Sequence, residues 1–145
     1  MQTILFDTSV LVAGFVAAHP KHHQAYLWLK RALANEFTLA VSTHSIAECY
    51  GVLTRLPLSP KLSPAVAKRL IEENVGKTAN LVTLTHADYL TVIKDTAALG
   101  LTGGIIYDAL IFRAAKKIKA QHILTFNQRD FHRLAQEDTG YIISP

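Results

Sequence analysis

Three acidic residues of this chain stand at positions where a purely structural role is hard to assign. Asp7 directly follows the apolar run Thr3–Phe6, which predicts a buried strand. In open α/β sheets, ligands bind in the crevice beyond the carboxyl ends of the strands. Glu48 and Asp108 each lie among apolar residues at helical spacing, with no lysine or arginine spaced to neutralise Asp108. Because an inward-pointing carboxylate must be paired, protonated or bound to a cation, these acids are candidates for a cation site.

A cluster of carboxylates indicates a particular chemistry. Like charges that approach one another raise their pKa values, and a hard divalent cation relieves that repulsion. Ligand sets made of oxygen alone favour Mg²⁺ or Mn²⁺ over zinc. Such an ion can activate a water for attack on a phosphodiester. On spacing alone, helix caps and surface charges remain the alternative interpretation of Asp7, Glu48 and Asp108.

The charge of the chain favours a polyanionic partner. The 145 residues carry a formal net charge of +4, and the pI is about 9.3. A basic surface raises the local concentration of nucleic acid. Arg113, Lys116 and Arg129 are therefore candidate substrate contacts, within a basic stretch that also contains Lys117, Lys119 and Arg133. A solvated helix face is the alternative for each of them.

Short apolar runs alternate with longer helical stretches, which predicts an α/β fold with a mostly parallel sheet of four or five strands. We expect strands at 3–6, 37–41, 81–84 and 122–125, with a fifth at the sheet edge at 141–143. We expect helices starting at 9–13 and at 43, and spanning 20–35, 65–74, 86–99 and 105–120, with a loop at 56–64. The length fits a single domain, 1–145.

Neither a membrane span nor a secretory signal is predicted, since the longest early apolar run is broken by Asp7. Cys49 is the only cysteine, which excludes an intramolecular disulfide and a multi-cysteine metal site. We interpret Cys49 as a small buried hydrophobe on a helix. These features favour a reducing, cytoplasmic setting.

Four segments together resemble the PIN-domain nucleases, and among them the VapC-type toxins of toxin–antitoxin systems. In chain order they are LFDTSVLVA (5–13), SIAECYGVLTRLP (45–57), GGIIYDALIFRAA (103–115) and ILTFNQRDF (123–131). The match runs through almost the whole chain. By this resemblance Asp7, Glu48 and Asp108 are the metal-binding and catalytic acids, and Ser9 and Thr125 support the site.

The resemblance implies a three-layer α/β/α sandwich and Mg²⁺- or Mn²⁺-dependent hydrolysis of RNA by an activated water. It also implies a small antitoxin protein as inhibitor, and a homodimer. The proline-rich loop and helix at 57–75 resemble the helical projection that meets a partner in this family.

The last of the four segments departs from the family pattern. Many members have an aspartate two residues after the threonine, where this chain has Asn127. An asparagine can still support the site, by offering a carbonyl oxygen or orienting a water, but it contributes no negative charge. Asp130 is the candidate fourth acid for metal binding and catalysis, with a helix cap or a surface residue as the equal alternative. This departure leaves open whether one or two ions bind.

Three other functions need consideration. A phosphatase of the haloacid-dehalogenase type would require a second acid two residues after Asp7, where this chain has Ser9. A histidine-centred site could use His19, His22 and His23, but no acid lies in that strongly polar stretch, so we expect solvated helix-surface histidines. A noncatalytic PIN-like module that binds RNA or a partner is favoured only by Asn127.

Overall fold

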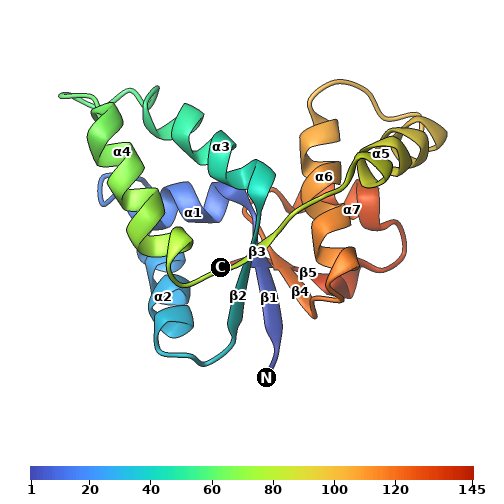
Figure 1. The fold of residues 1–145 in the computed structure, drawn as a ribbon, viewed down its shortest axis with the longest axis horizontal. Coiled ribbons are helices and arrows are strands. Elements are labelled where there is room, and N and C mark those ends of the chain that lie inside the picture. The colour runs from blue at the N-terminus through green and yellow to red at the C-terminus, as the bar shows by residue number, and fades with distance from the viewer.

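The computed structural model describes residues 1–145 and is built around a sheet of five parallel strands in the order β3-β2-β1-β4-β5. Figure 1 shows this sheet between two groups of helices. The strands are β1 (Thr3–Phe6), β2 (Thr38–Ser42), β3 (Asn80–Val82), β4 (His122–Leu124) and β5 (Ile142–Ile143). The expected mostly parallel sheet, including its short edge strand, is thereby confirmed.

The strand order places a topological switch point beside β1. From β1 the chain moves outward to β2 and β3, and then returns to pair β4 with the other side of β1. Leu5 is accordingly paired with Ala40 on one side and with Ile123 on the other. After β1 the chain continues toward one side of the sheet, and after β4 it continues toward the other side, which leaves a crevice between the carboxyl ends of these two strands. Open α/β sheets bind their ligands at such crevices.

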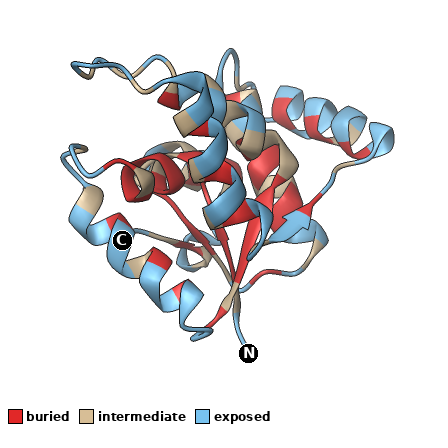
Figure 2. Ribbon diagram, turned by 60° about the vertical axis from the view of Figure 1, so that its left-hand side comes forward, coloured by how far each residue is buried: buried red, intermediate tan, exposed pale blue.

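Helices cover both faces of the sheet, and the side chains of alternate β1 residues pack into two separate hydrophobic cores, one on each face. Ile4 and Phe6 pack with the first group of helices, and Leu5 packs with the second. The first group is α1 (Thr8–Phe15), α2 (His22–Leu33), α3 (Thr43–Leu53) and α4 (Pro64–Ile71). The second group is α5 (His86–Ala98), α6 (Ile105–Lys117) and α7 (Gln128–Ala135). Figure 2 shows the buried residues concentrated in the sheet and on the helix sides that face it, as a three-layer α/β/α sandwich requires.

Most helix boundaries differ little from expectation, but two local features differ. The helix expected at 65–74 ends at Ile71 and continues as a π-helical turn over Glu72–Gly76. Ser42 occupies the N-cap position of α3, yet its hydroxyl makes no capping hydrogen bond.

Helix α7 was not predicted from the sequence. Only Phe131 and Leu134 of this helix are buried, so the sequence offers a very short apolar stripe.

Helix α5 is fixed to α6 by a buried carboxylate. Asp88 is 6% exposed and closes a capping box with Thr85 at the start of α5. It also pairs with Arg113 at 2.9 Å and with Lys117 at 2.8 Å, both on α6.

No helix of the structure has the length and apolar character needed to cross a bilayer.

Candidate active site

Asp7 lies at the end of the central strand, at the switch point of the sheet. Its backbone N–H donates to Leu124 O at 2.9 Å, which ties the end of β1 to the end of β4. Asp7 occupies the N-cap position of α1, but its carboxylate makes no capping hydrogen bond. At 4% exposure the side chain is buried without an ion-pair partner. The structure therefore gives Asp7 no role as a helix cap or as a surface charge.

Two hydroxyl groups hold the Asp7 carboxylate in one orientation. Ser9 Oγ and Thr125 Oγ1 each donate to Asp7 Oδ2 at 2.7 Å. Ser9 Oγ also accepts a hydrogen bond from the Phe126 N–H at 3.2 Å, and Thr125 is fully buried. Both hydroxyls bind the same oxygen, so Asp7 Oδ1 receives no side-chain hydrogen bond. Ser9 and Thr125, which were expected to support the site, thus both orient the Asp7 carboxylate.

Glu48 and Asp108 share a pocket with Asp7. The pocket has a volume of ≈ 430 Å³, and Asn127 and Ser9 also line it. Glu48 is half-buried on α3, and Asp108 is half-buried in the first turn of α6. Three helices or strands far apart in sequence therefore bring the three predicted acids to one hollow.

The acids perturb one another electrostatically. Burial raises the pKa of Asp7, and the neighbouring Glu48 charge raises it further against the lowering effect of Ser9 and Thr125. Burial, followed by the charges of Asp7, Asp130 and Glu48, raises the pKa of Asp108 to about 7. Like charges in a partly desolvated hollow favour the protonated form of a carboxyl, or a bound cation.

Asn127 joins Asp108 to Asp130. Its Nδ2 donates to Asp108 Oδ2 at 3.3 Å and to Asp130 Oδ2 at 3.0 Å. Asp130 lies in the first turn of α7, where it also pairs with Arg133 at 3.3 Å. Asp130 is thus linked to the acidic group through Asn127, but it does not line the pocket itself.

The chemistry of these side chains fits a hard divalent cation. The candidate donors are carboxylate oxygens, and neither Asp7 nor Asp108 has a cationic side chain as partner. No three acidic, histidine or cysteine side chains lie close enough together, as they stand, to hold a metal ion by themselves. Mg²⁺ commonly binds through one or two carboxylates and keeps several waters, so an open arrangement suits it better than a cage would.

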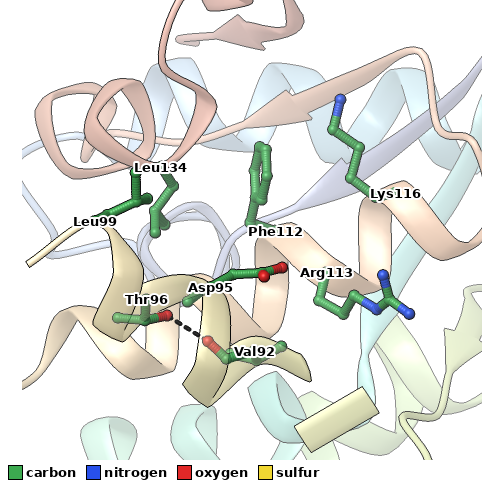
Figure 3. A pocket seen from close by; sticks show the side chains of 9 residues that line it. Val92, Asp95, Thr96, Leu99, Phe112, Arg113, Lys116 and Leu134 are labelled. Carbon is green, nitrogen blue, oxygen red and sulfur yellow. Dashed lines mark hydrogen bonds between the residues drawn. The ribbon is translucent and has the colours of Figure 1, made fainter. Parts of the chain in front are cut away.

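The expected substrate contacts on α6 lie elsewhere. Arg113 pairs with Asp88, and Lys116 pairs with Asp138 at 3.3 Å. Figure 3 shows both side chains around a second pocket, between α5, α6 and α7, with Phe112 and Leu134. The structure does not bring Arg113 and Lys116 to the carboxylates. Arg129 is exposed on α7, two residues after Asn127.

Two residues near the acids, Lys21 and His44, were missed in the sequence, and a third, His19, was assigned to solvent. Lys21 and His19 line the carboxylate pocket, and His44 Nε2 lies 3.6 Å from Glu48 Oε2. The expectation of solvated histidines is wrong for His19 and His22, which are half-buried, while His23 is exposed. The i, i+4 spacing of His44 and Glu48 was the available signal for His44. Lys21 and His19 lie in the turn between α1 and α2, for which the sequence offers no signal.

Cys49 has the role that the sequence predicted. It is 1% exposed and belongs to the core between the sheet and the first helical layer. Burial, with smaller contributions from Glu48 and Asp7, raises the pKa of its thiol. A thiol in this state is an inert core side chain rather than a nucleophile.

Comparison with known proteins identifies the family to which this fold belongs. The family model described as PIN domain matches residues 4–137. Ribonuclease VapC27 of Mycobacterium tuberculosis is 35% identical over 115 residues, which are 79% of this chain and 78% of that protein. Ribonuclease VapC40 of the same species is 33% identical over 115 residues, 79% of this chain and 80% of that protein. The chain belongs to the PIN-domain family, and these relatives are VapC ribonucleases.

Solved structures show the same fold at lower sequence identity. The Mycobacterium tuberculosis toxin VapC20, described as cleaving the sarcin-ricin loop, aligns with a TM-score of 0.70 and 18% identity, over 88% of this chain and 92% of that one. VapBC2 from Rickettsia felis, bound to a DNA fragment of its promoter, aligns with a TM-score of 0.70 and 18% identity, over 99% of both chains.

Proposed function

We propose that this protein is a metal-dependent endoribonuclease, acting in the cytoplasm as the toxin of a type II toxin–antitoxin pair. The observation that carries the proposal is the buried carboxylate of Asp7. It is held by Ser9 and Thr125 at the switch point of the sheet, in one pocket with Glu48 and Asp108. Relatives named as ribonucleases, at 33–35% identity over 79% of the chain, supply the substrate class.

The proposed site binds Mg²⁺ or Mn²⁺ through Asp7, Glu48 and Asp108, with Asp130 as a further acid behind Asn127. When bound, the cation supplies Lewis-acid activation of a water and neutralises charge on the phosphodiester. Ser9 and Thr125 fix the orientation of Asp7, so that Oδ1 is available in the pocket. Asn127 restrains Asp108 and Asp130 by donating to both. No side chain in this pocket is required as a covalent nucleophile.

Substrate recognition belongs to cations that are not already paired within the fold. Arg113 and Lys116 were the expected contacts, and their ion pairs with Asp88 and Asp138 leave them at most a role in long-range attraction of RNA. Arg129 remains a proposed direct contact, because it is exposed and lies on α7 beside Asn127.

A small antitoxin protein is the proposed inhibitor, and an apolar groove between α3 and α4 is its proposed seat. The groove is lined mainly by apolar atoms of Ile46, Ala47, Tyr50, Pro64, Ala65, Lys68, Ile71 and Glu72. It shares helix α3 with Glu48, so a peptide bound there lies next to the acidic pocket. A homodimer is also proposed, since α5 exposes Tyr89, Leu90 and Ile93 on its outer side.

The alternative is a noncatalytic module that keeps the fold and binds RNA or a partner. To decide between them, purified protein free of inhibitor is incubated with tRNAs and total RNA in Mg²⁺, Mn²⁺ or EDTA. Asp7→Asn and Asp108→Asn serve as separate controls. The endoribonuclease proposal expects discrete cuts that need the metal and disappear in both variants. RNA binding without cleavage in any metal would support the noncatalytic module instead.

A further inference from the structure

Lys21 is an exposed cation at the rim of the acidic pocket, and no acid neutralises it. Its side chain lines the same hollow as Asp7, Glu48 and Asp108. Its Nζ lies 4.7 Å from the centre of the Phe126 ring, and no carboxylate lies within ion-pair distance of it. By contrast, Arg113, Lys116 and Lys117 all have acidic partners. The ammonium group of Lys21 is therefore free to bind a ligand, and it lies at the carboxylate pocket.

The position of this ammonium group is coupled to the position of Asp7. Phe126, on which it rests, donates its backbone N–H to Ser9 Oγ at 3.2 Å. Ser9 Oγ in turn donates to Asp7 Oδ2 at 2.7 Å. Phe126 also packs against the core of the first helical layer. The aromatic seat of Lys21 is thus held at a fixed place relative to the proposed catalytic acids.

His19 orders the backbone at Lys21. The Lys21 N–H donates to His19 Nδ1 at 3.0 Å. A neutral imidazole that accepts at Nδ1 carries its proton on Nε2, so the ring keeps one donor. His19 is half-buried and lines the pocket with Lys21. The turn between α1 and α2 therefore brings an ammonium group and an imidazole donor to one wall of the hollow.

A phosphodiester that enters a hollow lined with carboxylates is repelled unless positive charge compensates it. A bound divalent cation offsets only two of the negative charges carried by the acids and the phosphodiester that is cut, and the neighbouring phosphates of the RNA strand retain theirs. Lysine binds phosphate as a flexible point charge, and an aromatic face is a weak competitor for its ammonium group. We propose that Lys21, with His19 as a second donor, binds a backbone phosphate of the RNA strand at the rim of the carboxylate pocket. The proposal rests on the function proposed above for the substrate class, but it concerns binding rather than the chemical step.

The test compares Lys21→Gln with Lys30→Gln, which removes the same charge from an exposed lysine of α2 outside the pocket. Binding of a labelled single-stranded RNA 12-mer is measured by fluorescence anisotropy in Ca²⁺, at several salt concentrations. Cleavage of the same RNA in Mg²⁺ is measured in parallel. Lys21→Arg retains the charge, and His19→Asn removes the imidazole.

We expect Lys21→Gln to weaken RNA binding about tenfold and to reduce the salt slope of log K by about 0.7, the share of one phosphate contact on a single strand. Lys30→Gln should leave both unchanged, Lys21→Arg should restore most of the affinity, and His19→Asn should give a smaller loss. In Mg²⁺, Lys21→Gln should raise KM and leave kcat nearly unchanged, because the lost contact forms equally in ground state and transition state.

Equal affinity and salt slope for Lys21→Gln and Lys30→Gln would overturn the proposal, whether or not the protein cleaves RNA. Failure of the proposed function looks different. In that case the wild-type protein binds the 12-mer with the Lys21 dependence described, but does not cut it in Mg²⁺ or Mn²⁺. Absence of both binding and cleavage would contradict both proposals.

Discussion

The side-chain amide of Asn127 donates to the Asp130 carboxylate at 3.0 Å, and the same nitrogen reaches Asp108 Oδ2 at 3.3 Å. A neutral double donor between two acids reduces their repulsion without adding charge. An aspartate at this position would add a charge and remove both donated hydrogen bonds. Asn127, the departure of this chain from the family pattern, is therefore an integral part of the acidic network.

Asn127→Asp should destabilise the metal-free protein and strengthen metal binding. The added carboxylate lies near Asp108 and Asp130, so we expect Tm in EDTA to fall by at least about 3 °C, which corresponds to about 1 kcal/mol for a chain of this size. The apparent Mn²⁺ affinity should rise about tenfold, because a further charged ligand becomes available. Calorimetric Mn²⁺ titration of Asn127→Asp and of Asn127→Ala, which loses the amide without gaining charge, checks this. Equal Mn²⁺ affinity in the two variants would contradict it.

Asp108 should make the metal-free protein less stable as pH rises. Its pKa is raised from 3.8 to about 7, so the folded state keeps a proton that the unfolded chain releases in that window. Stability therefore falls between pH 4 and pH 7, and the loss is complete above pH 7. Because the side chain is only half-buried, solvent screening leaves a net effect of about 1 kcal/mol.

Asp108→Asn should accordingly raise Tm in EDTA by about 3 °C at pH 8 and leave it unchanged at pH 4. Thermal unfolding monitored by circular dichroism at both pH values is the measurement. Asp95→Asn, an exposed aspartate of α5, is the matched control. A variant that is less stable than the wild type at pH 8 would show that Asp108 is compensated in the metal-free fold.

Thr125→Val should lower kcat while the fold is retained. The substitution keeps the shape of a fully buried side chain and removes one of the two hydroxyls that bind Asp7 Oδ2. Loss of an outer contact to a metal-binding carboxylate typically costs 10–100-fold in activity or metal affinity, and we expect about this effect. Steady-state cleavage kinetics, with Thr139→Val as the exposed control, measure it. Wild-type kcat and Mn²⁺ affinity in Thr125→Val would remove Thr125 from the site.

Asp88→Asn should loosen α5 from α6 without abolishing cleavage. Hydrogen bonds from Lys117, from the Thr85 backbone and from Arg113 hold the pKa of Asp88 far below its usual range. A depressed pKa gives stability that is present above the ordinary value of 3.8 and is lost as pH falls below it. We therefore expect Asp88→Asn to lower Tm by several degrees at pH 7, with a difference that shrinks toward pH 2. A constant difference across this range would mean that lost packing, rather than lost charge, is responsible.

The sequence was sufficient to predict the parallel sheet and the inward orientation of the three acids, because both depend on patterns among residues close together in the chain. Apolar runs mark the strands, and Asp7 follows one of them directly, so the strand-end rule places it in the crevice beyond the carboxyl ends of the strands without tertiary information. Glu48 and Asp108 interrupt apolar helix faces, which marks them as inward-pointing charges. The four segments shared with the PIN-domain family then indicate that these acids meet.

What the sequence could not predict depends on contacts between distant segments. Asp88 is an ordinary first-turn acid until the fold brings Arg113 and Lys117 of another helix to it. Because of these ion pairs, Arg113 and Lys117 of the basic stretch are already neutralised within the fold, although the sequence suggested that this stretch binds RNA. Lys21 is equally ordinary until the turn between α1 and α2 places it on Phe126.

Asp7 and its neighbours form the proposed metal-dependent catalytic site. The most direct test is single-turnover cleavage of a susceptible RNA by the wild type, Asp7→Asn and Asp95→Asn, each in Mn²⁺ and in EDTA. The account predicts that the wild type and Asp95→Asn cut at equal rates in Mn²⁺, that EDTA abolishes both, and that Asp7→Asn loses at least about a thousandfold in rate, about 4 kcal/mol of transition-state stabilisation. Cleavage by Asp7→Asn at the wild-type rate, or cleavage that persists in EDTA, would contradict it.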